Sequence, residues 1–318
     1  MLPRSYRRTG AELFKHLRVI FAVVMKFCSL LILTVSCLLL SSCEKGVEFK
    51  LDDVTPKLVV EATIENGQSP LVYLSKSQAY FSEIDFNTLA NSFVRNAEVY
   101  ISNGVRTHKL KEYAVPVTPG INFYYYSNDP GSPGTAFTGE LNKQYTLRIL
   151  SEGKEYTATT TIPDTTRHID SLSWKPAPGS ADPKDAVVML TAKDRPGFGD
   201  YTRYFTKRNS EPFYPGINSV YDDQVIDGTG FTVQVDRGVA RQSSSGSFKF
   251  FERGDTVTLK LCNIDKATFD FWRTMEFTYQ SVGNPFSSPT KVLSNINGGA
   301  LGYFGGYGAQ YRTIVIPR

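Results

Sequence analysis

The sequence predicts a mainly β protein, with an N-terminal immunoglobulin-like β-sandwich followed by a second β-rich unit that carries one α-helix. Three observations indicate this class: short segments alternate apolar and polar residues, turn residues separate them, and the 318 residues are 13% aromatic with 25 Gly and 17 Pro. Alternation places every second side chain on the same face of a strand. Frequent Gly and Pro are typical of short strands joined by tight turns and not of a helical bundle.

The first unit is predicted over residues 57–163. Residues 58–64 read as a strand whose even-numbered side chains are all apolar and share one face. Asn103-Gly104 separates the alternating segments 98–102 and 105–110. This is the strongest hairpin signal in the chain, because Asn-Gly favours the turn that matches the twist of the flanking strands. Several such strands within one unit predict the immunoglobulin-like sandwich.

The second unit is predicted over residues 186–318, after a linker at 164–185 in which proline and glycine break regular structure. Most periodic segments of this unit again alternate as strands. One segment differs, because Asp265 can cap a helix over residues 266–281 and Gly283 can end it. The helix would present one apolar stripe, made of Phe271, Trp272, Met275 and Tyr279.

Residues 1–42 read as a leader with a lipoprotein signal peptide, and Met25 is the predicted true start. Lys26 precedes an apolar run of about 14 residues, shorter than the roughly 20 that a membrane-spanning helix needs. The run ends in Leu40-Ser41-Ser42-Cys43, which resembles a bacterial lipobox. Cys43 is therefore the predicted lipidated residue, and residues 43–56 would form a polar tether. A single-pass membrane anchor is the alternative interpretation.

Removal of this leader changes the charge of the chain. Six of the 35 Lys and Arg residues and one of the 31 Asp and Glu residues precede Cys43, which leaves 29 basic and 30 acidic side chains. This near balance argues against a nucleic-acid partner. Cys262 is then the one remaining thiol besides Cys43, so the sequence predicts neither an intramolecular disulfide nor a cysteine zinc site. Cys262 lies in an alternating run and is predicted to be a small buried apolar residue. No cofactor is predicted.

Two clusters are candidate binding residues. Asp222, Asp223 and Asp227 could offer oxygen ligands to a metal ion such as calcium, although their spacing is not that of an EF-hand and a solvated turn is the alternative. Tyr124, Tyr125 and Tyr126 lie in an aromatic run that could contact a peptide or glycan ligand. Packing inside the fold is an equally good explanation of the tyrosines.

A catalytic site is not evident in the sequence. The glycine-rich segment 297–308 fits neither nucleotide-binding pattern, so its glycines are expected to permit positive φ or close approach of backbones. The sequence holds no nucleophilic triad pattern and no zinc-protease motif. We therefore expect a protein without enzymatic activity. A hydrolase that uses scattered carboxylates is the alternative.

Several segments are distinctive enough to compare with a family. CEKGVEF follows the lipobox, and the chain continues with KLVVEATIENG, YTATTTIP and NPFSSPTKVLSNINGGALGYFGGYGAQYRTIVIP. Together they resemble the Bacteroidetes outer-membrane lipoproteins of the domain of unknown function 4249 family. The resemblance covers nearly the whole chain after Cys43, and Cys43 is the one residue whose role it transfers.

The resemblance implies a function and a location. Members of this family are typically encoded beside TonB-dependent receptors, which implies an accessory, lipid-anchored binding protein that partners a TonB-dependent transporter in nutrient capture or import. The alternative is a structural or adhesin-like envelope protein that binds a protein or a surface polymer. The membrane would be reached through the lipid on Cys43. Lys45 interrupts the acidic stretch that favours surface display in this phylum, so the cell surface and the periplasmic face both remain open.

Overall fold

The computed structural model describes residues 21, 25–27, 31, 55–78, 86–224, 227–240, 250–284 and 290–318. The segment Thr55–Arg318 forms one compact unit. The predicted signal peptide, the lipidation site Cys43 and most of the predicted tether lie outside the described residues. Within the described part of the chain, no helix is both long and apolar enough to span a membrane.

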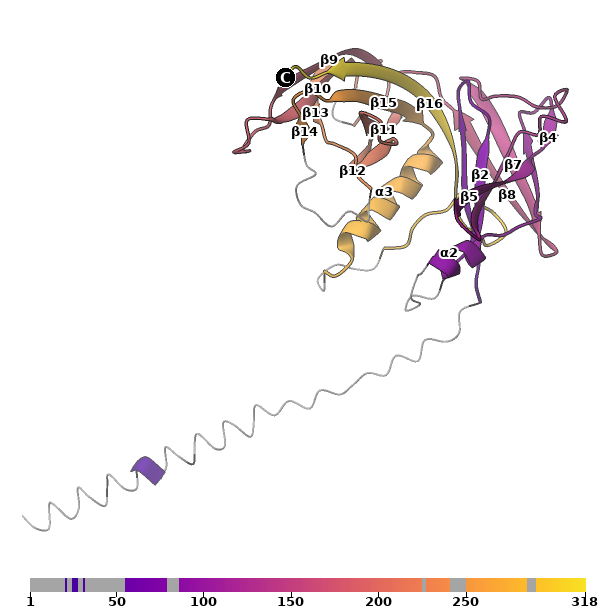
Figure 1. The fold of residues 1–318 in the computed structure, drawn as a ribbon, viewed down its shortest axis with the longest axis horizontal. Coiled ribbons are helices and arrows are strands. Elements are labelled where there is room, and N and C mark those ends of the chain that lie inside the picture. The colour runs from indigo at the N-terminus through magenta and orange to yellow at the C-terminus, as the bar shows by residue number, and fades with distance from the viewer. Residues whose placement is uncertain are drawn as a thin grey trace, which may run out of the picture. The chain divides into compact units, whose positions relative to one another are not determined.

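Three β-sheets build the compact unit (Figure 1). The main sheet has the order β12 (Tyr214–Tyr221), β11 (Tyr201–Arg208), β15 (Thr256–Ile264), β16 (Leu301–Val315), β1 (Leu58–Glu65), β2 (Leu71–Lys76), β6 (Ile121–Ser127), β5 (Lys111–Thr118). The N-terminal sheet has the order β4 (Thr107–Lys109), β3 (Glu98–Ser102), β7 (Lys143–Ser151), β8 (Lys154–Ile162). The C-terminal sheet contains β13 (Gly230–Val235), β10 (Asp185–Lys193), β14 (Phe251–Glu252) and β9 (His168–Pro176), which pairs with β10.

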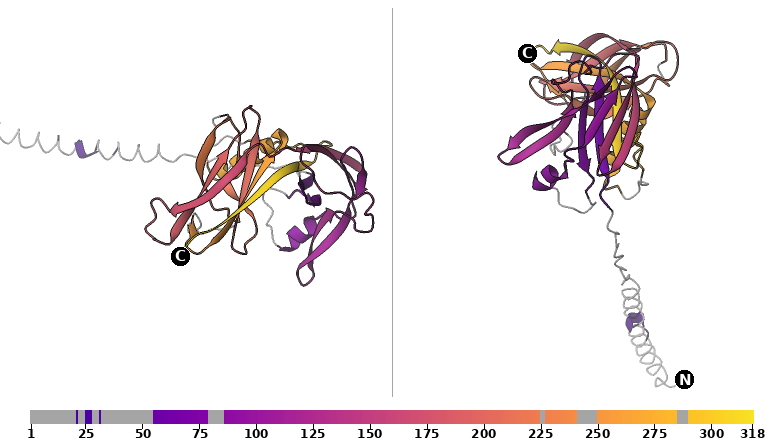
Figure 2. Two further views of the ribbon diagram at one scale, coloured as in Figure 1. Left: turned by 90° about the horizontal axis from the view of Figure 1, so that it is seen from above. Right: turned by 90° about the vertical axis from the view of Figure 1, so that its right-hand side faces the viewer.

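Strand β16 pairs with one strand from the N-terminal half of the chain and one from the C-terminal half. Its first half pairs in parallel with β1, and its second half pairs antiparallel with β15. Figure 2 shows this yellow strand running from the orange C-terminal strands to the violet N-terminal ones. The segments predicted as two units, 57–163 and 186–318, therefore share one sheet, and the predicted linker 164–185 contains β9. Pairing between such distant segments leaves no local signal in the sequence.

The glycines of β16 permit close packing against β8. A Cβ atom on Gly306 would lie 2.4 Å from the carbonyl oxygen of Thr161, and one on Gly308 would lie 2.6 Å from that of Pro163. Only glycine, which has no Cβ atom, allows two backbones to approach so closely. The structural interpretation of the glycine-rich segment is therefore confirmed.

The N-terminal sheet packs on one half of the main sheet. Their shared core contains Val60, Leu74 and Tyr126 from the main sheet, and Leu147 and Ile162 from the N-terminal sheet. These strands alternate buried and more exposed positions, which is the period of a strand with one face on a core. This half is a β-sandwich.

The other half of the main sheet is covered on both faces. The C-terminal sheet contributes Leu190 and Val235 to a core with Tyr204, Leu259 and Leu261 of β11 and β15. On the opposite face, helix α3 (Lys266–Ser281) packs against the main sheet through a cluster that includes Phe269, Phe271, Tyr303, Tyr307 and Cys262. The prediction of a mainly β fold with a helix over 266–281 is confirmed. A short helix, α2 (Phe86–Ser92), was not expected.

The cap of α3 also fastens the helix to the N-terminal sandwich. Asp265 accepts a hydrogen bond from the Thr268 N–H with one carboxylate oxygen (2.8 Å). Its other oxygen accepts hydrogen bonds from the Thr160 hydroxyl (2.7 Å) and the Thr161 N–H (2.9 Å) of β8. The predicted cap at Asp265 is confirmed, and it fixes the helix start relative to β8.

Candidate ligand-binding cavity

A cavity of about 690 Å³ lies among β11 and β15 of the main sheet, β10 and β13 of the C-terminal sheet, β12 and helix α3. Its walls are largely apolar and belong to the core of this half of the fold. The principal apolar residues are Leu190, Tyr204, Phe231, Val235, Leu259 and Leu261. The volume falls within the range of about 300–1,000 Å³ that is usual for small-molecule sites.

The alternation of β11 decides which side chains reach the cavity. Thr202 and Tyr204 line it, whereas Arg203 and Phe205 lie on the α3 side of the main sheet. The Tyr204 hydroxyl lies so close to Gly216 that a Cβ atom there would be 1.9 Å from it. Burial, with a smaller contribution from Tyr221, raises the pKa of Tyr204 far above its ordinary value of 10.0. Tyr204 is therefore a neutral phenol at physiological pH.

A buried arginine provides a positive charge in the cavity wall. Arg167, just before β9, has a side chain that is 3% exposed. Its Nε donates a hydrogen bond to Asp194 Oδ1 (3.0 Å), and one of its terminal nitrogens donates to the Thr202 hydroxyl (2.7 Å). The guanidinium also lies over the ring of Phe231, 5.6 Å from its centroid. These contacts hold the charge beside an apolar wall.

One stripe of helix α3 also lines the cavity. It consists of Phe269, Arg273, Glu276 and Gln280, which are spaced three or four residues apart and so lie on one face of the helix. Glu276 is buried, and both of its carboxylate oxygens accept hydrogen bonds from Ser219, one from its hydroxyl (2.5 Å) and one from its N–H (3.0 Å). The cavity therefore combines apolar walls with a fixed cation and a fixed anion.

Ser219 connects the cavity to a second hollow on the other side of β11. The Ser219 hydroxyl also accepts a hydrogen bond from Arg203 Nε (3.1 Å). Arg203 lies over Trp272, with its guanidinium carbon 3.4 Å from the ring centroid, and donates to the Tyr307 hydroxyl (3.3 Å). A continuous chain of contacts therefore runs from Glu276 in the cavity to Trp272 in the second hollow.

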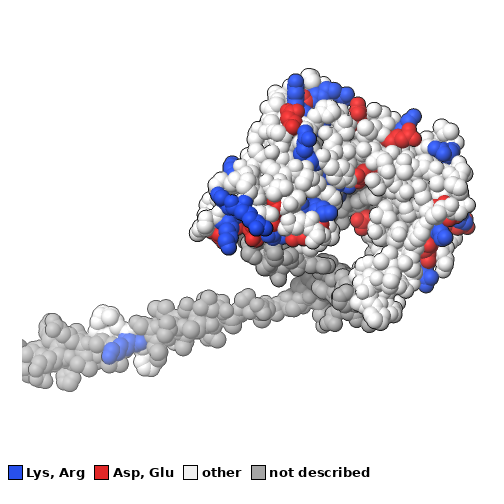
Figure 3. Space-filling model, turned by 45° about the horizontal axis from the view of Figure 1, so that its top comes forward, with Lys and Arg blue, Asp and Glu red and all other residues white. Residues whose placement is uncertain are grey.

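The second hollow, which we call the groove, has a volume of about 540 Å³. Two of its charged residues pair with each other: Lys260 forms an ion pair with Glu65, which also accepts a hydrogen bond from the Tyr311 hydroxyl. These mutual contacts give the groove a structural explanation. The cavity is the better candidate for a ligand site, because it is larger than the groove and lies between two sheets and a helix. On the face shown in Figure 3, acidic and basic side chains of the described residues are interspersed.

A family model described as domain of unknown function DUF4249 matches residues 44–313. The chain belongs to this family. A search among curated proteins gives no match. The matched region of the DUF4249 chain includes every residue named above for the cavity and the groove.

The three predicted tyrosines of the DUF4249 chain lie in β6 and have different surroundings. Tyr126 is buried, and its hydroxyl donates to the Val94 carbonyl and accepts from the Ala97 N–H, both at 3.1 Å. Tyr124 lies under the guanidinium of Arg95, 4.2 Å from the ring centroid. Tyr126 is thus a packing residue.

Tyr125 belongs to a different cluster, on the other side of the strand. It stacks with Tyr113 at 5.2 Å between ring centroids, and its ring centroid lies 6.1 Å from that of Tyr73. All three side chains are partly exposed. The structure therefore does not bring Tyr124, Tyr125 and Tyr126 together as one ligand surface.

The predicted aspartates of the DUF4249 chain are also separated by role. Asp222 lines the cavity. Asp227 accepts a hydrogen bond from the Gly197 N–H (2.6 Å). Asp223 instead lies beside Asp194 and Asp200, with one carboxylate oxygen from each of these three residues within 4.8 Å of the others.

Sequence reasoning missed the two buried charges of the cavity. Glu276 left a usable signal, because it lies seven residues after Phe269 and four after Trp272, on the side of α3 that faces the protein. A charged residue on that side of an amphipathic helix needs a partner. Arg167 lies in the polar sequence Thr165-Thr166-Arg167-His168, which carries no comparable signal.

Proposed function

We propose that this DUF4249 protein is a lipid-anchored lipoprotein of the outer membrane that binds a small molecule in the cavity and partners a TonB-dependent transporter in nutrient capture or import. The cavity carries the binding part of the proposal. The Cys43 lipobox supports the anchor, and the resemblance to lipoproteins encoded beside TonB-dependent receptors supports the transporter partnership.

The cavity walls indicate the chemistry of the ligand. Leu190, Leu259 and Leu261 favour an apolar body, because burial of apolar surface is the main source of affinity in such a site. Arg167 and Glu276 can orient a polar end, since each is held in place by its protein partners. An amphiphilic small molecule or a short apolar peptide fits this combination better than a glycan, whose hydroxyls would require many more polar partners.

Direct detection of the ligand tests the binding proposal. The full-length protein, extracted from its native membrane in mild detergent, should release a small molecule whose mass appears in native mass spectrometry. Val235→Trp fills part of the cavity and should remove that molecule, whereas Val117→Trp, at an exposed position of β5, should retain it. A wild-type protein free of any bound molecule, even after exposure to growth-medium extract, would contradict the proposal.

The anchor and the partner are tested separately. Cys43→Ala should move the protein out of the membrane fraction, whereas Cys37→Ala, inside the predicted signal, should leave it there. Gentle extraction should then co-purify the wild-type protein with a large transporter, since confinement to one membrane raises the effective concentration of both. Loss of growth on one nutrient after gene deletion supports uptake. Unchanged nutrient use with altered adhesion supports the structural alternative.

A further inference from the structure

Three aspartates meet where two loops of the C-terminal half approach each other. Asp194 follows β10, Asp200 precedes β11 and Asp223 follows β12. We call these residues the aspartate cluster. The loops are tied together, because Asp223 Oδ2 accepts hydrogen bonds from the Gly199 N–H (2.8 Å) and the Asp200 N–H (2.9 Å). The cluster therefore lies where hydrogen bonds join the two loops.

The cluster contains acceptors that lack donors. The Asp194 side chain is fully buried, and its Oδ1 accepts the hydrogen bond from Arg167. Asp194 Oδ2 and Asp200 Oδ2 are both buried without a hydrogen-bond partner. An unpaired buried acceptor destabilises a fold, and an unpaired buried charge does so more strongly. Two such oxygens in one cluster are available to bind a positive group.

The charged residues around the aspartate cluster indicate how much positive charge it can accept. Three carboxylates face one another, and Arg167 is the buried cation that contacts them through Asp194. Arg195 is exposed and offsets part of the charge at Asp200, and Thr166 hydrogen-bonds to Asp200. Burial, followed by the neighbouring carboxylates, raises the pKa of Asp200. Arg167 is thus one buried cation against three neighbouring carboxyl groups, so the cluster can accept further positive charge.

We propose that Asp194, Asp200 and Asp223 bind a divalent cation, and that this cation is Ca²⁺. Carboxylate oxygens are the ligands that hard cations prefer. Three carboxylate oxygens within 4.8 Å of one another can contact one Ca²⁺ ion, whose oxygen ligands lie about 2.3–2.6 Å away. Ca²⁺ also accepts irregular sites built from protein oxygens, whereas Mg²⁺ requires nearly ideal octahedral geometry and usually retains several waters. This site is independent of the ligand proposed for the cavity.

Bound Ca²⁺ would stiffen one side of the cavity. The ion would link the β10–β11 loop to the β12–β13 loop, next to the cavity residue Asp222, and would approach Arg167 through Asp194. A cation that binds only the folded state also stabilises that state. The competing explanation is a proton on Asp200, which would reduce the same repulsion without a metal.

Titration with the metal alone separates the two explanations. Full-length protein in detergent, stripped with EDTA and desalted, should bind one Ca²⁺ in calorimetry and gain about 3–6 °C in Tm at saturation. Mg²⁺ should give a smaller shift. The absence of a Tm shift and of binding heat up to about 10 mM Ca²⁺, beyond the range of extracellular calcium sites, would overturn the proposal.

Matched variants locate the site. Asp200→Asn and Asp223→Asn should weaken Ca²⁺ binding at least about tenfold, because each removes a charged ligand. Asp222→Asn and Asp227→Asn are the controls: they make the same substitution in the loop that holds Asp223, but at positions outside the aspartate cluster. Both variants should bind Ca²⁺ as the wild type does. Equal binding by all four variants would overturn the assignment. A higher Tm of Asp200→Asn in EDTA, with no response of the wild type to Ca²⁺, would establish the proton instead.

Discussion

The thiol of Cys262 shows how burial controls the chemistry of a single residue. Cys262 is fully buried in the cluster beneath α3. Burial raises the pKa of its thiol to about 12, despite the opposing effect of Lys260. The reactive thiolate is therefore almost absent near neutral pH.

We predict that native mature protein does not react with a maleimide reagent, and that one thiol reacts after unfolding in guanidinium. A sulfur of Cys43 that carries lipid would not react in either state. Mass spectrometry of the labelled protein counts the modified thiols. Rapid labelling of Cys262 under native conditions would show that the α3 face opens readily.

Some residue roles were predictable because they depend on local chemistry. Cys262 was expected to be buried from the alternation of its strand, and Asp265 was expected to cap α3 from its position before an apolar stripe. The aspartate cluster was not predictable. It unites Asp223 with residues 23 and 29 positions earlier, through loops whose approach depends on sheet pairing. The buried pair of Arg167 and Asp194 has the same origin.

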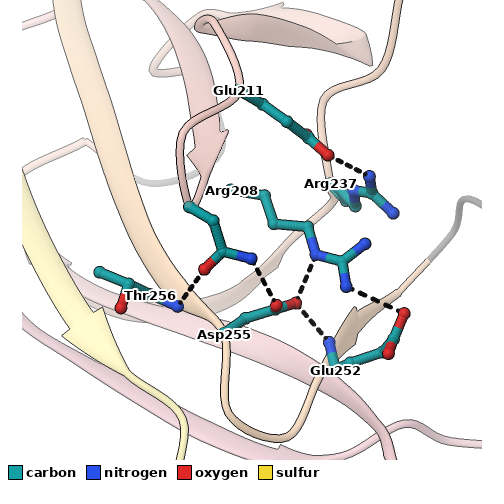
Figure 4. A network of polar contacts seen from close by, with 7 residues as sticks. Arg208, Glu211, Arg237, Glu252, Asp255 and Thr256 are labelled. Carbon is teal, nitrogen blue, oxygen red and sulfur yellow. Dashed lines mark hydrogen bonds and ion pairs between the residues drawn. The ribbon is translucent and has the colours of Figure 1, made fainter.

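At the scale of elements, a turn between β14 and β15 is organised by one carboxylate (Figure 4). Asp255 is buried and accepts hydrogen bonds from Arg208 Nε (2.6 Å), Asn209 Nδ2 (2.8 Å) and the Glu252 N–H (2.8 Å). Burial alone would raise the pKa of Asp255, but these hydrogen bonds and the charge of Arg208 hold it below the ordinary value of 3.8. The charged form is therefore the one that the turn stabilises.

We predict that Asp255→Asn lowers the free energy of unfolding by about 2 kcal/mol near neutral pH, as measured by urea denaturation. Because the folded-state pKa is lowered, the stabilisation is present above pH 3.8 and is lost as the pH falls through the folded-state pKa. The difference between wild type and variant should therefore shrink in acid. Glu155→Gln, which removes an exposed ion pair with Arg148, should change stability by less than about 1 kcal/mol. An equal effect of both substitutions would contradict the prediction.

The glycines of β16 give a second prediction for an element. Gly306→Val places a side chain against the backbone of β8, where a Cβ atom would lie 2.4 Å from the Thr161 oxygen, so we expect a loss of about 3 kcal/mol or failure to fold. Gly230→Val in β13 is the control, because a Cβ atom there meets no atom within 4 Å. Thermal denaturation compares the two variants. A Gly306→Val protein as stable as the control would contradict the close packing of β8 and β16.

Elements were predictable where apolar side chains recur with the period of a strand or of a helix, and they were less predictable elsewhere. Residues 256–262 and 266–281 showed clear periods of two and 3.6, and they correspond to β15 and α3. The first half of β16 was not evident as a strand, because its glycines carry no alternating pattern. Strand β9 was read as linker, because prolines flank it.

At the scale of the whole molecule, the sharing of β16 couples the two halves of the described fold. The strand contributes Phe304 to the N-terminal core and Tyr303 and Tyr307 to the cluster beneath α3. Loss of either half would expose one side of β16 and break its ladder with β1 or β15. The halves are therefore expected to unfold together.

We predict one cooperative transition for residues 55–318, which native-state hydrogen exchange can test. Buried amides of β7, in the N-terminal sheet, and of β15, in the main sheet, should exchange with the same free energy of opening, because both require global unfolding. The hairpin of β5 and β6 is a useful internal control, since β5 is a largely exposed edge strand and should open at lower free energy. If the amides of β7 exchanged with a much lower free energy of opening than those of β15, the two halves would be independent domains, as the prolines and glycines at 164–185 suggested. In that case the parallel pairing of β16 with β1 would be too weak to couple the cavity half to the N-terminal sandwich.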